Sequence, residues 1–187
     1  YTTIQEAIDN ANPGDTIIVL PGTYHENIVI NKEVTLIGVR RPVIDGGNLG
    51  PVVEITSDGV TFKGFKIVNG DPYGIRVNPN QELSIGIIIA GNTVTSTTSS
   101  IDDPSSSVEG TGVFITGKSY AGWKCEIMVI GNKVVKNQGY GIYIVNAEGE
   151  LPSSIKIKNN KLSSNAMDGL ALETVSYALV ERNMISE

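Results

Sequence analysis

Ionisable and aromatic residues recur in this sequence at one position of a repeated glycine motif. The motif is five residues long: a residue of any type, a glycine, an apolar residue, a variable residue and a second apolar residue. Its copies begin at residues 73, 111, 140 and 168. The alternation predicts a strand whose variable residue points outward. The outward residues are Glu54 (from an earlier copy without the glycine), Arg76, Phe114, Tyr143 and Ala171. Stacking of the copies would place them in one column.

This column contains the candidate catalytic residues, which are Arg76, Glu54 and Tyr143. Arg can neutralise a sugar carboxylate, and Tyr or Glu can transfer a proton, so the reactions considered are those of a polysaccharide lyase, hydrolase or epimerase. The candidate substrate-binding residues in or near the column are Tyr73, Phe114, Tyr140 and Glu173, and Trp123 of the inserted loop 117–125 is added to them. A surface ladder of paired side chains, without any ligand, is the alternative interpretation.

Metal-binding residue types are sparse in this chain. Asp102, Asp103 and Glu109 belong to a Ser- and Thr-rich segment that could bind Ca²⁺, although a solvated acidic loop explains them as well. A soft metal such as copper needs clustered His, Cys or Met, whereas His25 and Cys125 are each single. The sequence therefore predicts no metal site, and Ca²⁺ is the only cofactor considered.

A second repeated unit follows each glycine motif and predicts how the column is positioned. It has alternating apolar residues, then Gly or Asn, then Asn, a variable residue and an apolar residue. The asparagines that should share one structural position are Asn92, Asn132, Asn160 and Asn183. Stacked Asn side chains can hydrogen-bond from one coil to the next, and Gly or Asn before them tolerates positive φ. Units of two strands without an intervening helix predict a solenoid.

The two ends of the chain and two interruptions complete the predicted organisation. Residues 3–11 predict a capping helix, because their apolar positions form one stripe and Thr3 with Glu6 makes a capping box. We expect one domain over residues 1–187, with inserted loops at 95–110 and 117–125. Because the sequence stops inside a repeat, we expect it to be a fragment of a longer chain, and we expect the rest of that chain, or a second subunit, to cover the last coil.

Some outward positions of the second unit are apolar and predict a surface patch that the inserted loops cover, with a second subunit as the alternative. They are Ile88, Ala90, Met128 and Ile130. The net charge of −6 argues against nucleic acid as a partner. No run of apolar residues approaches the length of a membrane span, so membrane insertion is not predicted.

The chain also carries a family resemblance, which covers essentially its whole length and is clearest in its first quarter. Residues 3–28, with 34–38 and 43–47, resemble the opening of pectin-lyase-like β-helix proteins, and especially the NosD-type and parallel-β-helix-repeat proteins of archaeal and bacterial surfaces. The resemblance implies an all-β, single-stranded right-handed parallel β-helix with an N-terminal capping α-helix. It also implies an extracellular or cell-surface location, with polysaccharide or surface glycan bound along the outward face of the glycine-led strands.

Two alternatives accompany this functional expectation. One is a non-catalytic surface, adhesion or spacer module, because the matching residues build coils and turns and are not specific for an activity. The other is a copper-maturation factor, which the NosD-type resemblance implies but the scarcity of His, Cys and Met disfavours. The Asn-Thr-Asp and Gly-His-Gly motifs of pectin-degrading hydrolases are absent from the sequence.

Overall fold

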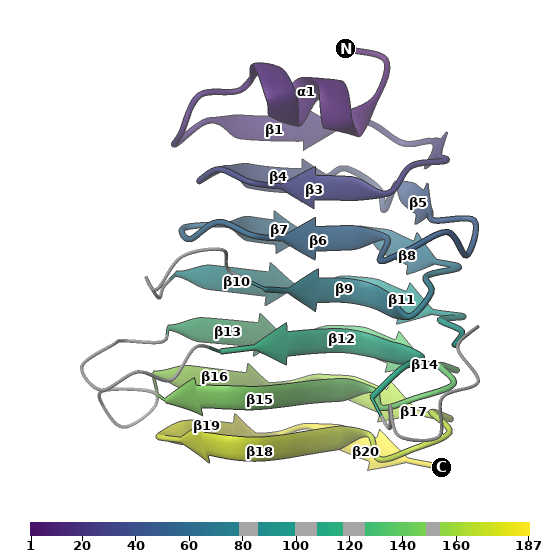
Figure 1. Cartoon of the computed structure of the whole chain (residues 1–187), viewed down its shortest axis with the longest axis vertical. Helices are drawn as coiled ribbons and strands as arrows, with labels where there is room; N and C mark the ends of the chain where they lie inside the picture. Colours follow the sequence, from purple (N-terminus) through teal and green to yellow (C-terminus); the bar gives the residue numbers. More distant parts are fainter. Residues whose placement is uncertain (79–85, 100–107, 118–125, 149–153) are drawn as a thin grey trace.

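The computed structural model describes residues 1–78, 86–99, 108–117, 126–148 and 154–187. In these ranges the chain winds through short strands that stack coil upon coil beneath a short N-terminal helix (Figure 1). Strands of successive coils pair in parallel and build three sheets, named A, B and C in this article.

Each sheet takes one strand from each coil it passes through. Sheet A contains β1 (Thr16–Val19), β4 (Thr35–Gly38), β7 (Thr61–Lys63), β10 (Ile87–Ala90), β13 (Ile127–Ile130), β16 (Ile155–Lys158) and β19 (Ala178–Glu181). Sheet B contains β2 (Thr23–Tyr24), β5 (Val43–Asp45), β8 (Lys66–Val68), β11 (Thr93–Thr95), β14 (Lys133–Val135), β17 (Lys161–Ser163) and β20 (Met184–Ser186). Sheet C contains β3 (Ile28–Ile30), β6 (Val53–Ile55), β9 (Tyr73–Val77), β12 (Thr111–Thr116), β15 (Ile142–Glu148) and β18 (Leu170–Ser176).

The predicted two strands per coil are therefore too few, because sheet B supplies a third. From β8 onward the sheet B strands have three residues, of which only the central one points inward. A strand is recognised in a sequence by the alternation of apolar and polar residues over several positions. One inward apolar residue between two outward residues is too short to show that alternation, so these strands were not predicted.

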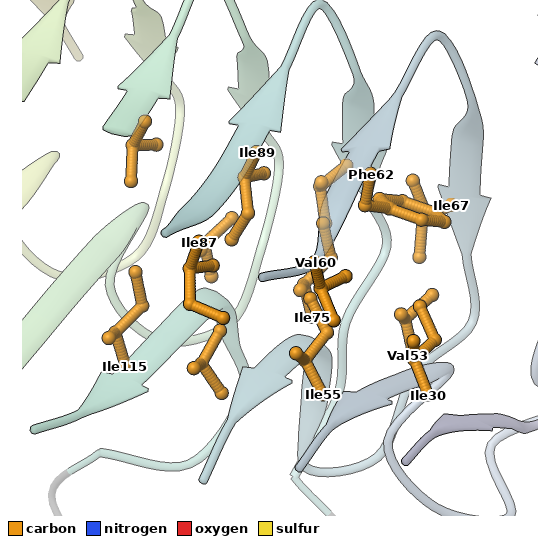
Figure 2. Close-up of a cluster of buried hydrophobic side chains, with 14 of the residues drawn as sticks. Ile30, Val53, Ile55, Val60, Phe62, Ile67, Ile75, Ile87, Ile89 and Ile115 are labelled. Atoms are coloured by element: carbon orange, nitrogen blue, oxygen red, sulfur yellow. The ribbon is translucent and has the colours of Figure 1, made fainter. Parts of the chain in front are cut away.

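Inward side chains of the three sheets form a continuous apolar core (Figure 2). Ile55 and Ile75 from sheet C face Phe62 and Ile89 from sheet A, and all four side chains are fully buried. Stacking of identical faces buries strands that are too short to form a core alone. The core thus fixes which residues of each strand point to solvent.

The asparagine ladder at the turns between sheets A and B is confirmed. The Nδ2 of Asn92 donates to Asn132 Oδ1 at 3.2 Å, that of Asn132 to Asn160 Oδ1 at 3.1 Å, and that of Asn160 to Asn183 Oδ1 at 2.9 Å. The preceding residues have positive φ, for example 66° at Gly131. Asn132 also donates to the carbonyl of Ile89, so the buried turns are tied to the coil before them.

A second polar ladder, at the turns that follow sheet B, was not predicted. Asn137 Nδ2 donates to Asn165 Oδ1 at 2.9 Å, and the Thr97 hydroxyl donates to Asn137 Oδ1 at the same distance. The sequence does contain a signal for this ladder: Asn137 and Asn165 each lie five residues after an asparagine of the first ladder, Asn132 and Asn160. Thr97 replaces the Asn in the coil before, which hides the repeat.

The predicted capping helix is α1 (Ile4–Asn10), which lies over the first coil (Figure 1). The Thr3 hydroxyl accepts a hydrogen bond from the Glu6 N–H at 3.1 Å, as an N-cap does. The Gln5 side chain pairs with the free edge of β3, because its Oε1 accepts from Val29 N–H at 2.8 Å and its Nε2 donates to Val29 C=O at 3.2 Å. No helix in the described ranges is long and apolar enough to cross a membrane.

Candidate functional site

The predicted outward column lies on the outer face of sheet C. The registers pair Glu54 with Arg76, Arg76 with Phe114, Phe114 with Tyr143, and Tyr143 with Ala171. Neighbouring strands of a sheet are about 4.8 Å apart, so residues separated by a coil of sequence become nearest neighbours. The structure thus brings the three candidate catalytic residues onto one face.

Arg76 is held from two sides on this face. Its Nη1 lies 3.3 Å from Oε1 of Glu54, and the guanidinium carbon lies 5.8 Å from the centroid of the Tyr73 ring. The Nε atom is buried and has no hydrogen-bond partner in the described part of the chain. The side chains of Arg76 and Glu54 keep 35% and 26% of their surface exposed, so solutes can reach the ion pair.

The aromatic candidates form a continuous stack in the order Tyr73, Phe114, Tyr143 and Tyr140, and the first three rings come from successive coils. Ring centroids are 4.7 Å apart for Tyr73 and Phe114, 5.7 Å for Phe114 and Tyr143, and 5.1 Å for Tyr140 and Tyr143, with interplanar angles of 11°, 23° and 16°. Phe114 and Tyr143 are only 9% and 8% exposed although they point away from the core. The faces of these two rings pack against each other and against the neighbouring rings of the stack. The half-buried Tyr73 and Tyr140 are therefore the more accessible rings.

The Tyr143 hydroxyl donates a hydrogen bond to Oε2 of Glu173 in the next coil. Burial raises the pKa of Tyr143 to about 12, and the hydrogen bond and charge of Glu173 add to the effect. Burial also raises the pKa of Tyr73. A tyrosine hydroxyl with a raised pKa stays protonated at neutral pH, so Tyr143 is suited to donate a hydrogen bond and poorly suited to remove a proton.

Several sequence-predicted residues lie elsewhere or are not described. Trp123, Asp102 and Asp103 fall outside the described residues. Glu109 accepts a hydrogen bond from the Ser99 hydroxyl at 2.6 Å. The described residues contain no group of three or more His, Cys, Asp or Glu side chains arranged to hold a metal ion, so the Ca²⁺ hypothesis stays a prediction.

The apolar outward residues of sheet A occupy the column that the sequence predicted. Ile88 pairs with Met128 and Ala90 with Ile130, and all four are half-buried. The segments that precede β10 and β13 include residues outside the described ranges. What covers this patch therefore stays a prediction.

Comparison with known proteins agrees with this architecture. Residues 111–187 match the family model of the right-handed beta helix region. With three parallel sheets that coil beneath a capping helix, this chain is a right-handed parallel β-helix protein, as the sequence predicted.

One curated relative resembles part of the chain. The cell surface glycoprotein of Methanothermus fervidus is 38% identical over 73 residues, which cover 37% of this chain and 12% of the relative. The match thus spans a small part of that protein. No solved structure gave a significant match.

Proposed function

We propose that this chain is a β-helix module of a cell-surface protein, and that the outer face of sheet C binds neutral polysaccharide without cleaving it. The surface location is supported by the partial similarity to a cell surface glycoprotein. The observation that carries the binding proposal is the half-buried, solvent-accessible Arg76–Glu54 pair beside the ring of Tyr73. Such a pair offers both donors and acceptors to sugar hydroxyls, next to an apolar ring edge.

The charges on this face favour a neutral ligand. Arg76 and Glu54 compensate each other, and the exposed carboxylate of Glu173 lies on the same face three coils further along, within the length of a bound polysaccharide. An anionic sugar would have to compete with Glu54 for Arg76, and the negative charge of Glu173 would repel it. Uncharged hydroxyl groups can instead bridge the ion pair, as water does on a free surface.

Binding without turnover is supported by how the candidate catalytic groups are occupied. Glu54 is paired with Arg76, and Tyr143 is a protonated donor to Glu173. A general base must be able to accept a proton at the working pH and must lie free beside the substrate. Neither group meets both requirements.

The test is a screen of neutral polysaccharides on a glycan array, followed by affinity electrophoresis of variants. We expect Arg76→Ala to weaken binding about tenfold, because it removes the donors and leaves Glu54 unpaired. Lys156→Ala, which removes one positive charge from the outer face of sheet A, is the matched control and should bind normally. An array without neutral ligands, or an Arg76→Ala variant with full affinity, would overturn the proposal.

A spacer module is the second candidate function, and the ring stack favours it. Faces of Phe114 and Tyr143 that pack on neighbouring rings stabilise the solenoid and are not offered to a ligand. A spacer needs only this stability. A blank array with the intact protein is the result that the spacer predicts.

A further inference from the structure

The outer face of sheet B carries a line of cations that the site on sheet C does not use. The outward register along this sheet runs from Lys66 to Thr93, Lys133 and Lys161, one residue in each successive coil. The gap at Thr93 is filled by Arg41, whose Nη1 donates to the Thr93 hydroxyl at 3.1 Å. Each coil from β8 to β17 therefore presents a positive charge in one column.

These cations are not balanced along their own column, since Asp45 of β5 lies at the other outward position of sheet B and contacts His25 and Asn69. The strands β8, β11, β14 and β17 contain no acidic residue, although the chain as a whole has a net charge of −6. No ion pair joins Lys66, Lys133 or Lys161 to a carboxylate within the described ranges, and all three side chains are exposed. Like charges at neighbouring strand positions destabilise a sheet. An anionic ligand along the column would relieve that repulsion.

We propose that this column binds an acidic polysaccharide that carries a negative charge on every sugar residue. The charges repeat with the rise of one coil, about 4.8 Å, and a sugar residue in an extended polysaccharide has a similar length. The second outward position of the same strands supplies the Thr95 and Ser163 hydroxyls, which can hydrogen-bond to sugars. A flat sheet in register suits a straight polymer.

The lack of aromatic residues on the strands of this face favours a polysaccharide over nucleic acid. Single-stranded nucleic acids are bound by stacking their bases on aromatic side chains, and none of the strands β8, β11, β14 and β17 contains an aromatic residue.

The experiment measures dissociation constants by calorimetry for the whole chain with alginate, which is charged on every sugar, and hyaluronate, which is charged on every second sugar. Alginate should bind more tightly. The triple variant Lys66→Gln, Lys133→Gln and Lys161→Gln should weaken alginate binding about tenfold, with a shallower salt dependence. Arg at the same three positions should keep the affinity within about twofold, because the charges are retained.

Controls separate this column from the site on sheet C. Lys133→Gln should weaken alginate binding, whereas Lys156→Gln, with the same loss of charge on sheet A, should not. Arg76→Ala should bind alginate normally, so failure of either proposal is seen independently. The inference is overturned if wild-type protein does not bind alginate, if hyaluronate binds equally well, if the Gln triple variant keeps full affinity, or if single-stranded DNA binds this column more tightly.

Discussion

Carboxylates decide what the key side chains on sheet C can do. Glu54 forms an ion pair with the guanidinium of Arg76, and Glu173 accepts the hydrogen bond that the Tyr143 hydroxyl donates. Each contact joins residues of adjacent coils, because the parallel register makes them neighbours. At this scale the face has the properties of a polar recognition surface that is already hydrogen-bonded, and a ligand must compete with or bridge those contacts.

The raised pKa of Tyr143 predicts a specific pH dependence of stability. The folded state holds the proton up to a pKa of about 12, whereas the unfolded chain releases it near 10. The stabilisation is therefore complete below pH 10 and is lost as the pH rises through 12. In urea unfolding, wild type should lose more stability between pH 10 and 12 than Tyr143→Phe, which has no hydroxyl to ionise.

Tyr177→Phe is the control for this measurement, because the Tyr177 side chain is 55% exposed, so removal of its hydroxyl group leaves the core and the outer face of sheet C unchanged. Parallel stability curves for wild type and Tyr143→Phe across this range would contradict the account of Tyr143.

At the scale of elements, the turns between sheets A and B hold the coils in register. Asn132 is 1% exposed, and its side chain joins Asn92, Asn160 and the carbonyl of Ile89. Asn132→Ala should lower the free energy of unfolding by about 2–4 kcal/mol, because buried donors and acceptors in two coils lose their partners. Chemical denaturation measures this loss.

Asn183→Ala is the matched comparison, since Asn183 belongs to the same ladder but is only half-buried. Water can replace its contacts, so the loss should be clearly smaller. Equal losses for the two variants would show that burial of the ladder does not determine its contribution.

The sequence predicted the elements that repeat with side chains of one kind. The Asn ladder, the capping helix and the outward column of sheet C could be predicted because each has a recognisable motif. The motifs are represented by Asn132 in the ladder, Thr3 at the N-cap of the helix and Gly112 in the strands of sheet C. The three-residue strands of sheet B were missed, and with them the lysine column, since one inward residue gives no periodicity. The stacking of Phe114 on Tyr73 could not be predicted either, because it depends on side-chain rotamers across coils.

At the scale of the whole molecule, the solenoid is a rod whose faces differ in chemistry. Sheet C presents a compensated ion pair and aromatic edges, sheet B presents uncompensated cations, and sheet A presents half-buried apolar residues. A stacked core makes each face rigid over several coils, so ligands that are themselves repetitive polymers fit its geometry. The polar face of sheet C is the basis of the proposed function.

Amide chemical-shift mapping of the isotope-labelled chain tests that claim most directly. On titration with the neutral glycan that binds most tightly in the array, we predict saturable shifts in β6, β9, β12 and β15, around Glu54 and Arg76, with sheet A unchanged. Shifts confined to sheet A or sheet B, or no shifts at saturating glycan, would contradict a polysaccharide site on the outer face of sheet C.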